Sequence, residues 1–148
     1  MIKDHSNPFP HQIASEKDFN FYMKKMNISQ DDIIVCYDTK GLFSAPFVWF
    51  TFKIFGSNSV FVFNGNLENW QKINGQFDST KYEEKKQPVR TNLIPFKKDC
   101  SKIISYTEIL KISNDIEHNL NSEYQIIDAR THERFCGNVP EPREGNFS

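Results

Sequence analysis

Apolar residues recur at helical spacing near the start of the chain. Four large ones share one helical face: Phe19, Tyr22, Met23 and Met26. Ser15 and Asp18 lie just before this run and form a variant of the capping box, with aspartate in place of glutamate or glutamine. The pattern predicts an amphipathic helix over residues 15–26.

A short apolar run at 33–37 follows, rich in β-branched residues, and is typical of a strand buried in a parallel sheet. The turn at 38–41 ends it. Residues 44–55 then carry Pro46 in the first turn and end at Gly56, which predicts a second helix. Because this segment is apolar almost all round, we expect it to be buried.

The alternation continues with a strand at 60–63 and a short helix at 67–73, separated by the turn 64–66. Strands that alternate with helices indicate an open, doubly wound α/β sheet. Residues 76–104 are charged and weakly periodic, so we interpret them as a connecting segment rather than as part of a core.

After this segment, the pattern predicts a helix from Ser105 to about Asn119 and a strand at 124–128. Residues 136–148 show no periodicity, and no later strand is available to pair with 124–128. The second α/β unit is therefore expected to be incomplete. Unpaired strand edges and exposed aromatic residues such as Phe47, Phe50 and Phe52 predict marginal stability and aggregation.

Charge and hydropathy exclude several classes of protein. The 148 residues include 18 Lys and Arg against 19 Asp and Glu, which leaves a formal net charge of -1. No positive excess is available for nucleic acid or for an anionic membrane surface. The longest apolar stretch, 45–52, is far shorter than the roughly 20 residues of a membrane helix, and the first residues form no signal peptide. We therefore expect a soluble, cytoplasmic protein.

The three cysteines are Cys36, Cys100 and Cys136, and no pair has C-x-x-C spacing. Neither a disulfide framework nor a thiolate zinc site is predicted. His132 and Cys136 are four residues apart, but two ligands do not make a metal site. No metal and no cofactor are expected. No cysteine has an arginine six residues later, the spacing of a phosphatase loop.

Three segments together resemble the two-domain rhodanese and mercaptopyruvate sulfurtransferase family: Tyr37-Asp-Thr-Lys-Gly-Leu-Phe-Ser-Ala-Pro-Phe-Val-Trp49, Asn64-Gly-Asn-Leu-Glu-Asn-Trp70 and Asp128-Ala-Arg-Thr-His-Glu-Arg-Phe-Cys-Gly-Asn-Val-Pro-Glu-Pro-Arg143. The resemblance implies partial tandem rhodanese-like doubly wound parallel sheets, both incomplete. Residues 1–76 would be the later part of a first, non-catalytic domain. Residues 77–104 would be the interdomain linker, and 105–148 the opening of the catalytic domain.

The resemblance also implies roles for individual residues. Arg134 and Arg143 match arginines that contact a small anionic sulfur donor, thiosulfate or mercaptopyruvate, and the pair favours mercaptopyruvate. His11 matches a histidine of a proposed Asp-His-Ser relay. Taken without the family, each arginine is more often an exposed or salt-bridged residue, and His11 is more often a surface histidine. Arg130 beside Asp128 indicates a structural ion pair.

The catalytic cysteine of the family has no counterpart here. Sulfur transfer needs a thiolate at a strand-to-helix turn, where backbone N–H groups stabilise it. Asp38 stands at the equivalent turn of the first domain, Cys36 lies within an apolar strand, and Cys100 and Cys136 have no such motif. In the second domain the loop would lie beyond Ser148.

We therefore expect a sulfurtransferase by family that is inactive as this chain. The alternatives are a non-catalytic interaction module, or one half of a split enzyme that pairs with a complementary polypeptide carrying the cysteine loop.

Overall fold

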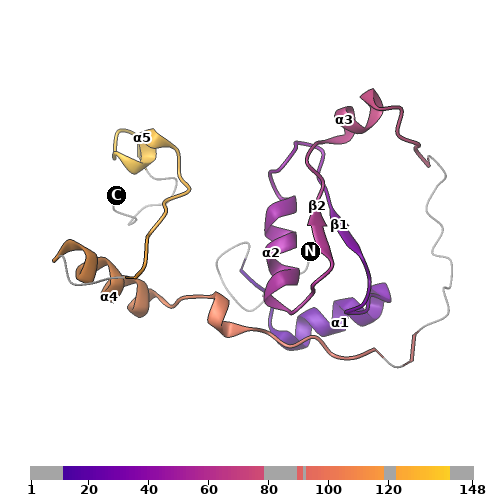
Figure 1. The fold of residues 1–148 in the computed structure, drawn as a ribbon, viewed down its shortest axis with the longest axis horizontal. Helices are drawn as coiled ribbons and strands as arrows, with labels where there is room; N and C mark the ends of the chain where they lie inside the picture. Colours follow the sequence, from indigo (N-terminus) through magenta and orange to yellow (C-terminus); the bar gives the residue numbers. More distant parts are fainter. Residues whose placement is uncertain (1–11, 79–89, 92, 119–122, 141–148) are drawn as a thin grey trace. The chain divides into compact units, whose positions relative to one another are not determined.

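The computed structural model describes residues 12–78, 90–91, 93–118 and 123–140. The chain divides into one unit over Met1–Ile103 and another over Ile104–Ser148. In the described residues, the first unit has a two-stranded sheet and three α-helices, and the second has two α-helices (Figure 1). In the described part of the chain, no helix has the length and apolar composition that a membrane crossing requires.

Helix α1 (Glu16–Met26) forms where the capping pattern predicts it. The Ser15 hydroxyl accepts a hydrogen bond from the backbone N–H of Asp18 at 3.1 Å, which satisfies one of the free donors of the first turn. The helix ends at Asn27, whose left-handed backbone (φ 59°) directs its N–H back to the last turn. Phe19 and Met23 are buried on the face that packs into the core.

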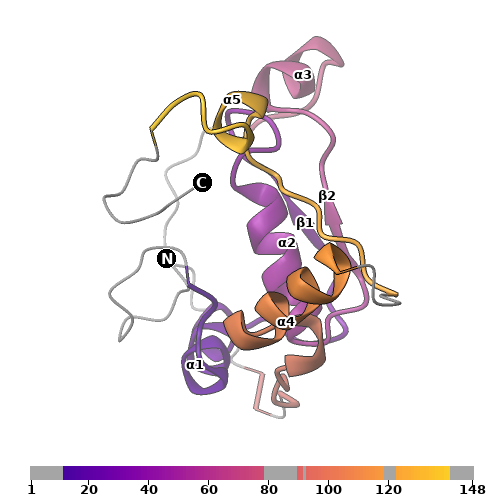
Figure 2. The same cartoon turned by 90° about the vertical axis from the view of Figure 1, so that its left-hand side faces the viewer.

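A parallel pair of strands follows, β1 (Ile34–Cys36) and β2 (Val60–Val62), with Val35 opposite Phe61. Helix α2 (Ala45–Ile54) connects them and lies along one face of the pair (Figures 1 and 2). Cys36 and Val60 are buried, whereas Val35 and Phe61 are each 56% exposed on the alternate positions. Both strands and the connecting helix match the sequence prediction. The structure shows an α/β arrangement with a small parallel sheet.

Aromatic rings form the centre of the core. Phe19 stacks on Phe55 with ring centroids 3.9 Å apart, and it meets Phe52 and Phe96 edge to face at 5.4 and 5.3 Å. Edge-to-face pairs of this kind add about 0.5–1.5 kcal/mol to the stabilisation from burial. These contacts join α1, α2 and a distant segment into one core.

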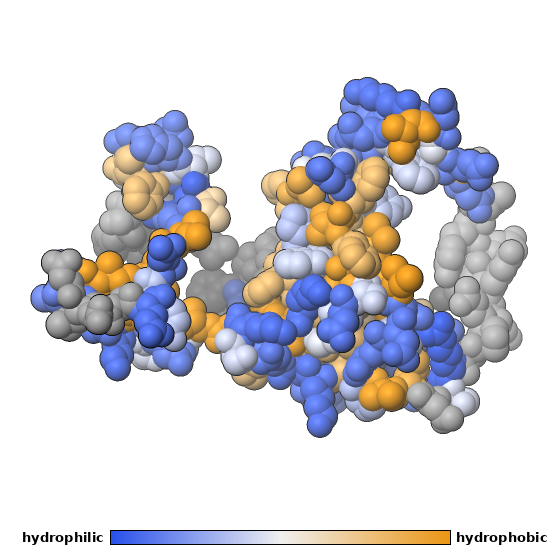
Figure 3. Space-filling model, viewed as in Figure 1, coloured by the Kyte–Doolittle hydropathy of each residue, from blue (hydrophilic) through white to orange (hydrophobic). Residues whose placement is uncertain are grey.

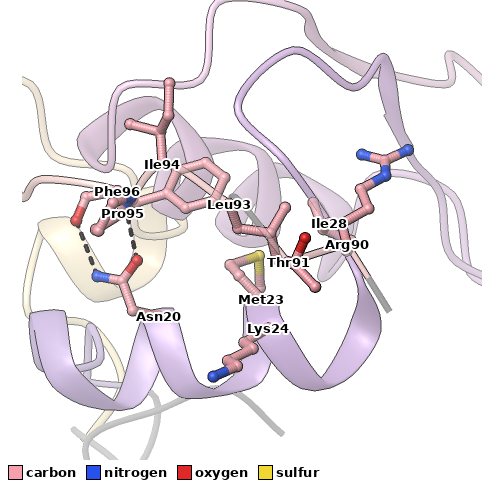
Figure 4. Close-up of a pocket in the computed structure, with 10 residues that line it drawn as sticks. All are labelled: Asn20, Met23, Lys24, Ile28, Arg90, Thr91, Leu93, Ile94, Pro95 and Phe96. Carbon is pink, nitrogen blue, oxygen red and sulfur yellow. Dashed lines mark hydrogen bonds between the residues drawn. The ribbon is translucent and has the colours of Figure 1, made fainter. Parts of the chain in front are cut away.

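That distant segment corrects the sequence analysis. Residues 76–104 were expected to lie outside any core, but Phe96 is only 1% exposed. The side-chain amide of Asn20 donates to the carbonyl of Phe96 at 2.9 Å and accepts from its N–H at 2.8 Å (Figure 4). Because side chains of α1, rather than a regular element, satisfy this backbone, the segment shows no periodicity that a sequence pattern could reveal.

Helix α2 is less buried than its composition suggested. Thr51, Phe52 and Ile54 are buried, but Val48 is 42% exposed and Phe50 is 38% exposed. Phe52 was expected among the exposed residues, and it packs against Phe19 instead. A helix that covers one face of only two strands buries one side, so its other side stays at the surface.

Helix α3 (Leu67–Lys72) follows β2 and carries a capping box between Asn66 and Asn69. None of its residues is buried. The short 3-10 helix η1 (Cys100–Lys102) closes the first unit, where the N–H of Asp99 donates to the carbonyl of Ile54 at 2.8 Å. The predicted helix at 67–73 is confirmed.

In the second unit, α4 (Tyr106–Glu117) begins with the capping box formed by Ser105 and Glu108, as the sequence indicated. Helix α5 (His132–Phe135) follows after extended chain. The predicted strand at 124–128 is wrong: these residues form no strand, because a strand requires a hydrogen-bonded partner and the described part of this unit supplies none. Apolar side chains reach the surface of both units (Figure 3), and Ile127 is 85% exposed.

Candidate functional site

The loop between β1 and α2 holds the first candidate site. Asp38 lies two residues after the end of β1, and the chain returns to start α2 at Ala45. Between them the backbone is left-handed at both Gly41 (φ 76°) and Leu42 (φ 59°). This turn brings the N–H groups at the start of α2 back toward Asp38.

Four backbone N–H groups converge on the Asp38 carboxylate. Oδ2 accepts from Phe43 at 2.9 Å, Ser44 at 2.8 Å and Ala45 at 3.0 Å, and Oδ1 accepts from Lys40 at 3.0 Å. Hydrogen bonds from the backbone N–H groups of Ala45, which has the largest effect, and of Ser44, Phe43 and Gly41 lower the pKa of Asp38 from its ordinary 3.8 to about 2. We refer to the loop 38–45, closed in this way, as the Asp38 cradle.

Sulfur transfer requires backbone N–H donors at the start of a helix that stabilise a thiolate. The Asp38 cradle has such donors, but they bind a carboxylate. Backbone donors at the start of a helix stabilise negative charge, whether on a thiolate, a persulfide or a carboxylate. Here the chain's own aspartate uses those donors. A carboxylate has no sulfur to accept or transfer.

The cysteines lie outside the cradle. Cys36 is buried in β1, and this burial raises the pKa of its thiol. Cys100 is exposed at the start of η1. Cys136 is also exposed and caps the C-terminus of α5. The sequence analysis did not predict the short helix before Cys136.

The expected arginine site is described only in part. Arg134 lies on α5 and is half-buried. Arg143 and His11 lie outside the described residues. The predicted Asp128–Arg130 ion pair is confirmed, with Nη2 of Arg130 2.7 Å from Oδ2 of Asp128. Arg130, and more weakly the charge of Arg134, lower the pKa of Asp128, so both guanidinium groups act on this carboxylate.

The sequence analysis considered His132 and Cys136 only as metal ligands and missed their contact. Sγ of Cys136 is 3.6 Å from Nε2 and 3.8 Å from Nδ1 of His132. Four-residue spacing on a helix places two side chains on one face, and that is the signal that could have found the pair. No group of three or more His, Cys, Asp or Glu side chains suited to a metal occurs among the described residues.

A cavity of about 250 Å³ lies between α1 and the segment 90–96 (Figure 4). Met23, Leu93 and Phe96 make much of its lining apolar. Its guanidinium, Arg90, is turned to Asp32, with Nη1 and Oδ2 2.8 Å apart. Its lining includes no His, Cys, Asp or Glu side chain, so we interpret the cavity as a packing gap.

The chain is similar along nearly its whole length to known sulfurtransferases. It is 38% identical over 143 residues to a probable 3-mercaptopyruvate sulfurtransferase of Schizosaccharomyces pombe, covering 97% of this chain and 46% of the relative. It is 31% identical over 148 residues to the human 3-mercaptopyruvate sulfurtransferase, covering 98% and 46%. It is also 32% identical over 143 residues to the thiosulfate sulfurtransferase of Rattus norvegicus, covering 95% and 44%.

A crystal structure of an Escherichia coli 3-mercaptopyruvate sulfurtransferase, described as having the rhodanese fold, matches with a TM-score of 0.69 and 27% identity. It covers 97% of this chain and 51% of the solved one. No family model matches the chain. The chain spans about half the length of the curated relatives it matches.

Proposed function

The chain belongs to the rhodanese and 3-mercaptopyruvate sulfurtransferase family, and from this premise we propose that it is a non-catalytic portion of such an enzyme. Residues 1–76 would belong to the non-catalytic domain, 77–104 to the linker, and 105–148 to the opening of the catalytic domain. The reaction of the whole enzyme would move sulfane sulfur from thiosulfate or mercaptopyruvate through a cysteine persulfide to a thiophilic acceptor.

The observation that carries this proposal is the Asp38 cradle. Its N–H donors are already satisfied by a carboxylate at 2.8–3.0 Å, and no cysteine among the described residues occupies a comparable loop. Cys36, the cysteine nearest in sequence to the cradle, is buried in the core. A cysteine loop on another length of polypeptide would then supply the persulfide.

Donor binding would fall to the second unit. Arg134 and Arg143 would hold the carboxylate or sulfonate group of the donor, because a guanidinium binds two oxygens at once. His11 would act in a relay only in an assembly that brings it to the cysteine loop.

The test is sulfur release by the purified full chain. Thiocyanate is measured with thiosulfate and cyanide, and sulfide with mercaptopyruvate and a thiol reductant. The proposal predicts no release above a protein-free control. Thiosulfate binding is measured separately by calorimetry on the chain and on Arg134→Gln, which is expected to weaken it. Turnover by the unmodified chain would refute the non-catalytic assignment.

A second candidate, a non-catalytic interaction module or one half of a split sulfurtransferase, is favoured by one observation. The sheet face opposite α2 exposes Val35 and Phe61 beside Tyr37, although parallel sheets are usually covered on both faces. Restored sulfur release on mixing with a polypeptide that carries a family cysteine loop would support the split enzyme. Binding without turnover would support the interaction module.

A further inference from the structure

The contact between Cys136 and His132 distinguishes this thiol from the others. The two side chains stand one helical turn apart on α5, and both are exposed. Sγ lies almost equally far from the two ring nitrogens, at 3.6 and 3.8 Å. Either neutral tautomer therefore has an unprotonated ring nitrogen within 3.8 Å of Sγ. A cysteine with a histidine base in reach is the basic unit of a nucleophilic thiol.

The other two cysteines lack this arrangement and serve as internal references. Cys36 is 6% exposed in the core, where reagents do not reach it. Cys100 is exposed, but no described histidine lies within hydrogen-bond distance of it. Nδ1 of His118 donates to the carbonyl oxygen of Asn114 at 2.8 Å, and His132 contacts Cys136. Cys100 and Cys136 are both exposed, so we attribute any difference in their reaction rates to the imidazole beside Cys136.

His132 also borders an open hollow of about 460 Å³ in the second unit. Its lining combines apolar and charged groups: Ile126, Ile127, Asp128, Arg130, His132 and Phe135. The one carboxylate, Asp128, is held by Arg130 at 2.7 Å and also feels the charge of Arg134. The lining holds one carboxylate and one guanidinium, and the charge of Arg134 also acts on that carboxylate, so we expect the hollow to favour a small anion with an apolar body.

We propose that Cys136, with His132 as its base, is a reactive thiol that exchanges with small anionic disulfides. His132 takes the proton from Sγ, and the thiolate attacks one sulfur of the disulfide. The bond between Cys136 and that sulfur forms as the disulfide bond breaks. The second sulfur leaves with the bonding electron pair and is protonated from the imidazolium or from solvent. One disulfide replaces another, so no further oxidant is needed.

Site-resolved labelling of the full chain tests the proposal. The chain is reacted with the dianionic aromatic disulfide dithiobis(nitrobenzoate), and mass spectrometry of peptides gives the rate at each cysteine. We expect Cys136 to react several times faster than Cys100, and Cys36 to stay unlabelled until the chain is unfolded. His132→Gln is expected to slow Cys136 by about tenfold, which is the worth of one charge-assisted hydrogen bond, and to leave Cys100 unchanged.

His118→Gln is the matched control, because it removes an exposed histidine of the same unit that does not contact a thiol. It should leave both rates unchanged. The dicationic disulfide cystamine tests the effect of the reagent's charge. Its preference for Cys136 over Cys100 should be smaller than that of the dianionic reagent. Equal wild-type rates at Cys136 and Cys100, or a slowing of less than twofold in His132→Gln, would overturn the proposal. Neither outcome bears on sulfur turnover, which is measured separately.

Discussion

Replacing Phe96 with alanine tests whether the segment after the first α/β elements is part of the core. Phe96 is 1% exposed and packs edge to face on Phe19 at 5.3 Å. Removing a buried phenylalanine ring costs about 3–5 kcal/mol. The backbone hydrogen bonds of residue 96 with Asn20 involve no side-chain atom of Phe96, so they persist in the variant. We therefore expect a loss of about 3–4 kcal/mol in the free energy of unfolding.

The assay is urea unfolding of the full chain followed by circular dichroism, with Ile94→Ala as the matched control. Ile94 lies in the same segment but is 65% exposed, so its truncation should cost less than about 0.5 kcal/mol. If Phe96→Ala prevents folding, Phe96→Leu should still fold and lose about 1 kcal/mol. A Phe96→Ala chain as stable as Ile94→Ala would show that the segment does not pack as described.

Two further predictions concern caps and charges. Asp38→Asn should lower the urea midpoint at pH 6, because an amide accepts the cradle hydrogen bonds less strongly than a carboxylate. The pKa of Asp38 is lowered to about 2, so the advantage of the wild type is complete above the ordinary value of 3.8 and is lost as pH falls toward 2. A midpoint difference that stays constant from pH 6 to pH 2.5 would contradict this. Ser105→Ala should remove the N-cap of α4 at a cost of about 1 kcal/mol, seen as reduced helicity at 222 nm; unchanged helicity would count against the capping box.

Local signals explain most of what the sequence predicted correctly. Ser15 and Ser105 each predicted a helix start because the capping pattern spans only four residues. The two strands and α2 followed from a change of hydrophobic period over short windows, and their parallel pairing follows from the helix between them.

Features that depend on distant partners were not predicted. Phe96 is buried because Asn20, 76 residues earlier, holds its backbone. Residues 124–128 have strand-like composition, but composition alone does not provide the partner that a strand needs. The convergence of four N–H groups on Asp38 required the left-handed turn at Gly41 and Leu42, which no periodicity reports.

Sulfur release by the purified full chain is the most direct test of the central claim. That claim is that, in the described residues, the strand-to-helix loop holds the Asp38 carboxylate where sulfur transfer needs a thiolate, so the chain alone releases no sulfur. The measurement compares the wild type with Cys136→Ser, using thiosulfate and mercaptopyruvate as donors. The account predicts no thiocyanate or sulfide above the protein-free control in either protein. Turnover by the wild type that Cys136→Ser abolishes would place the sulfur-carrying thiol outside any cradle and contradict the account.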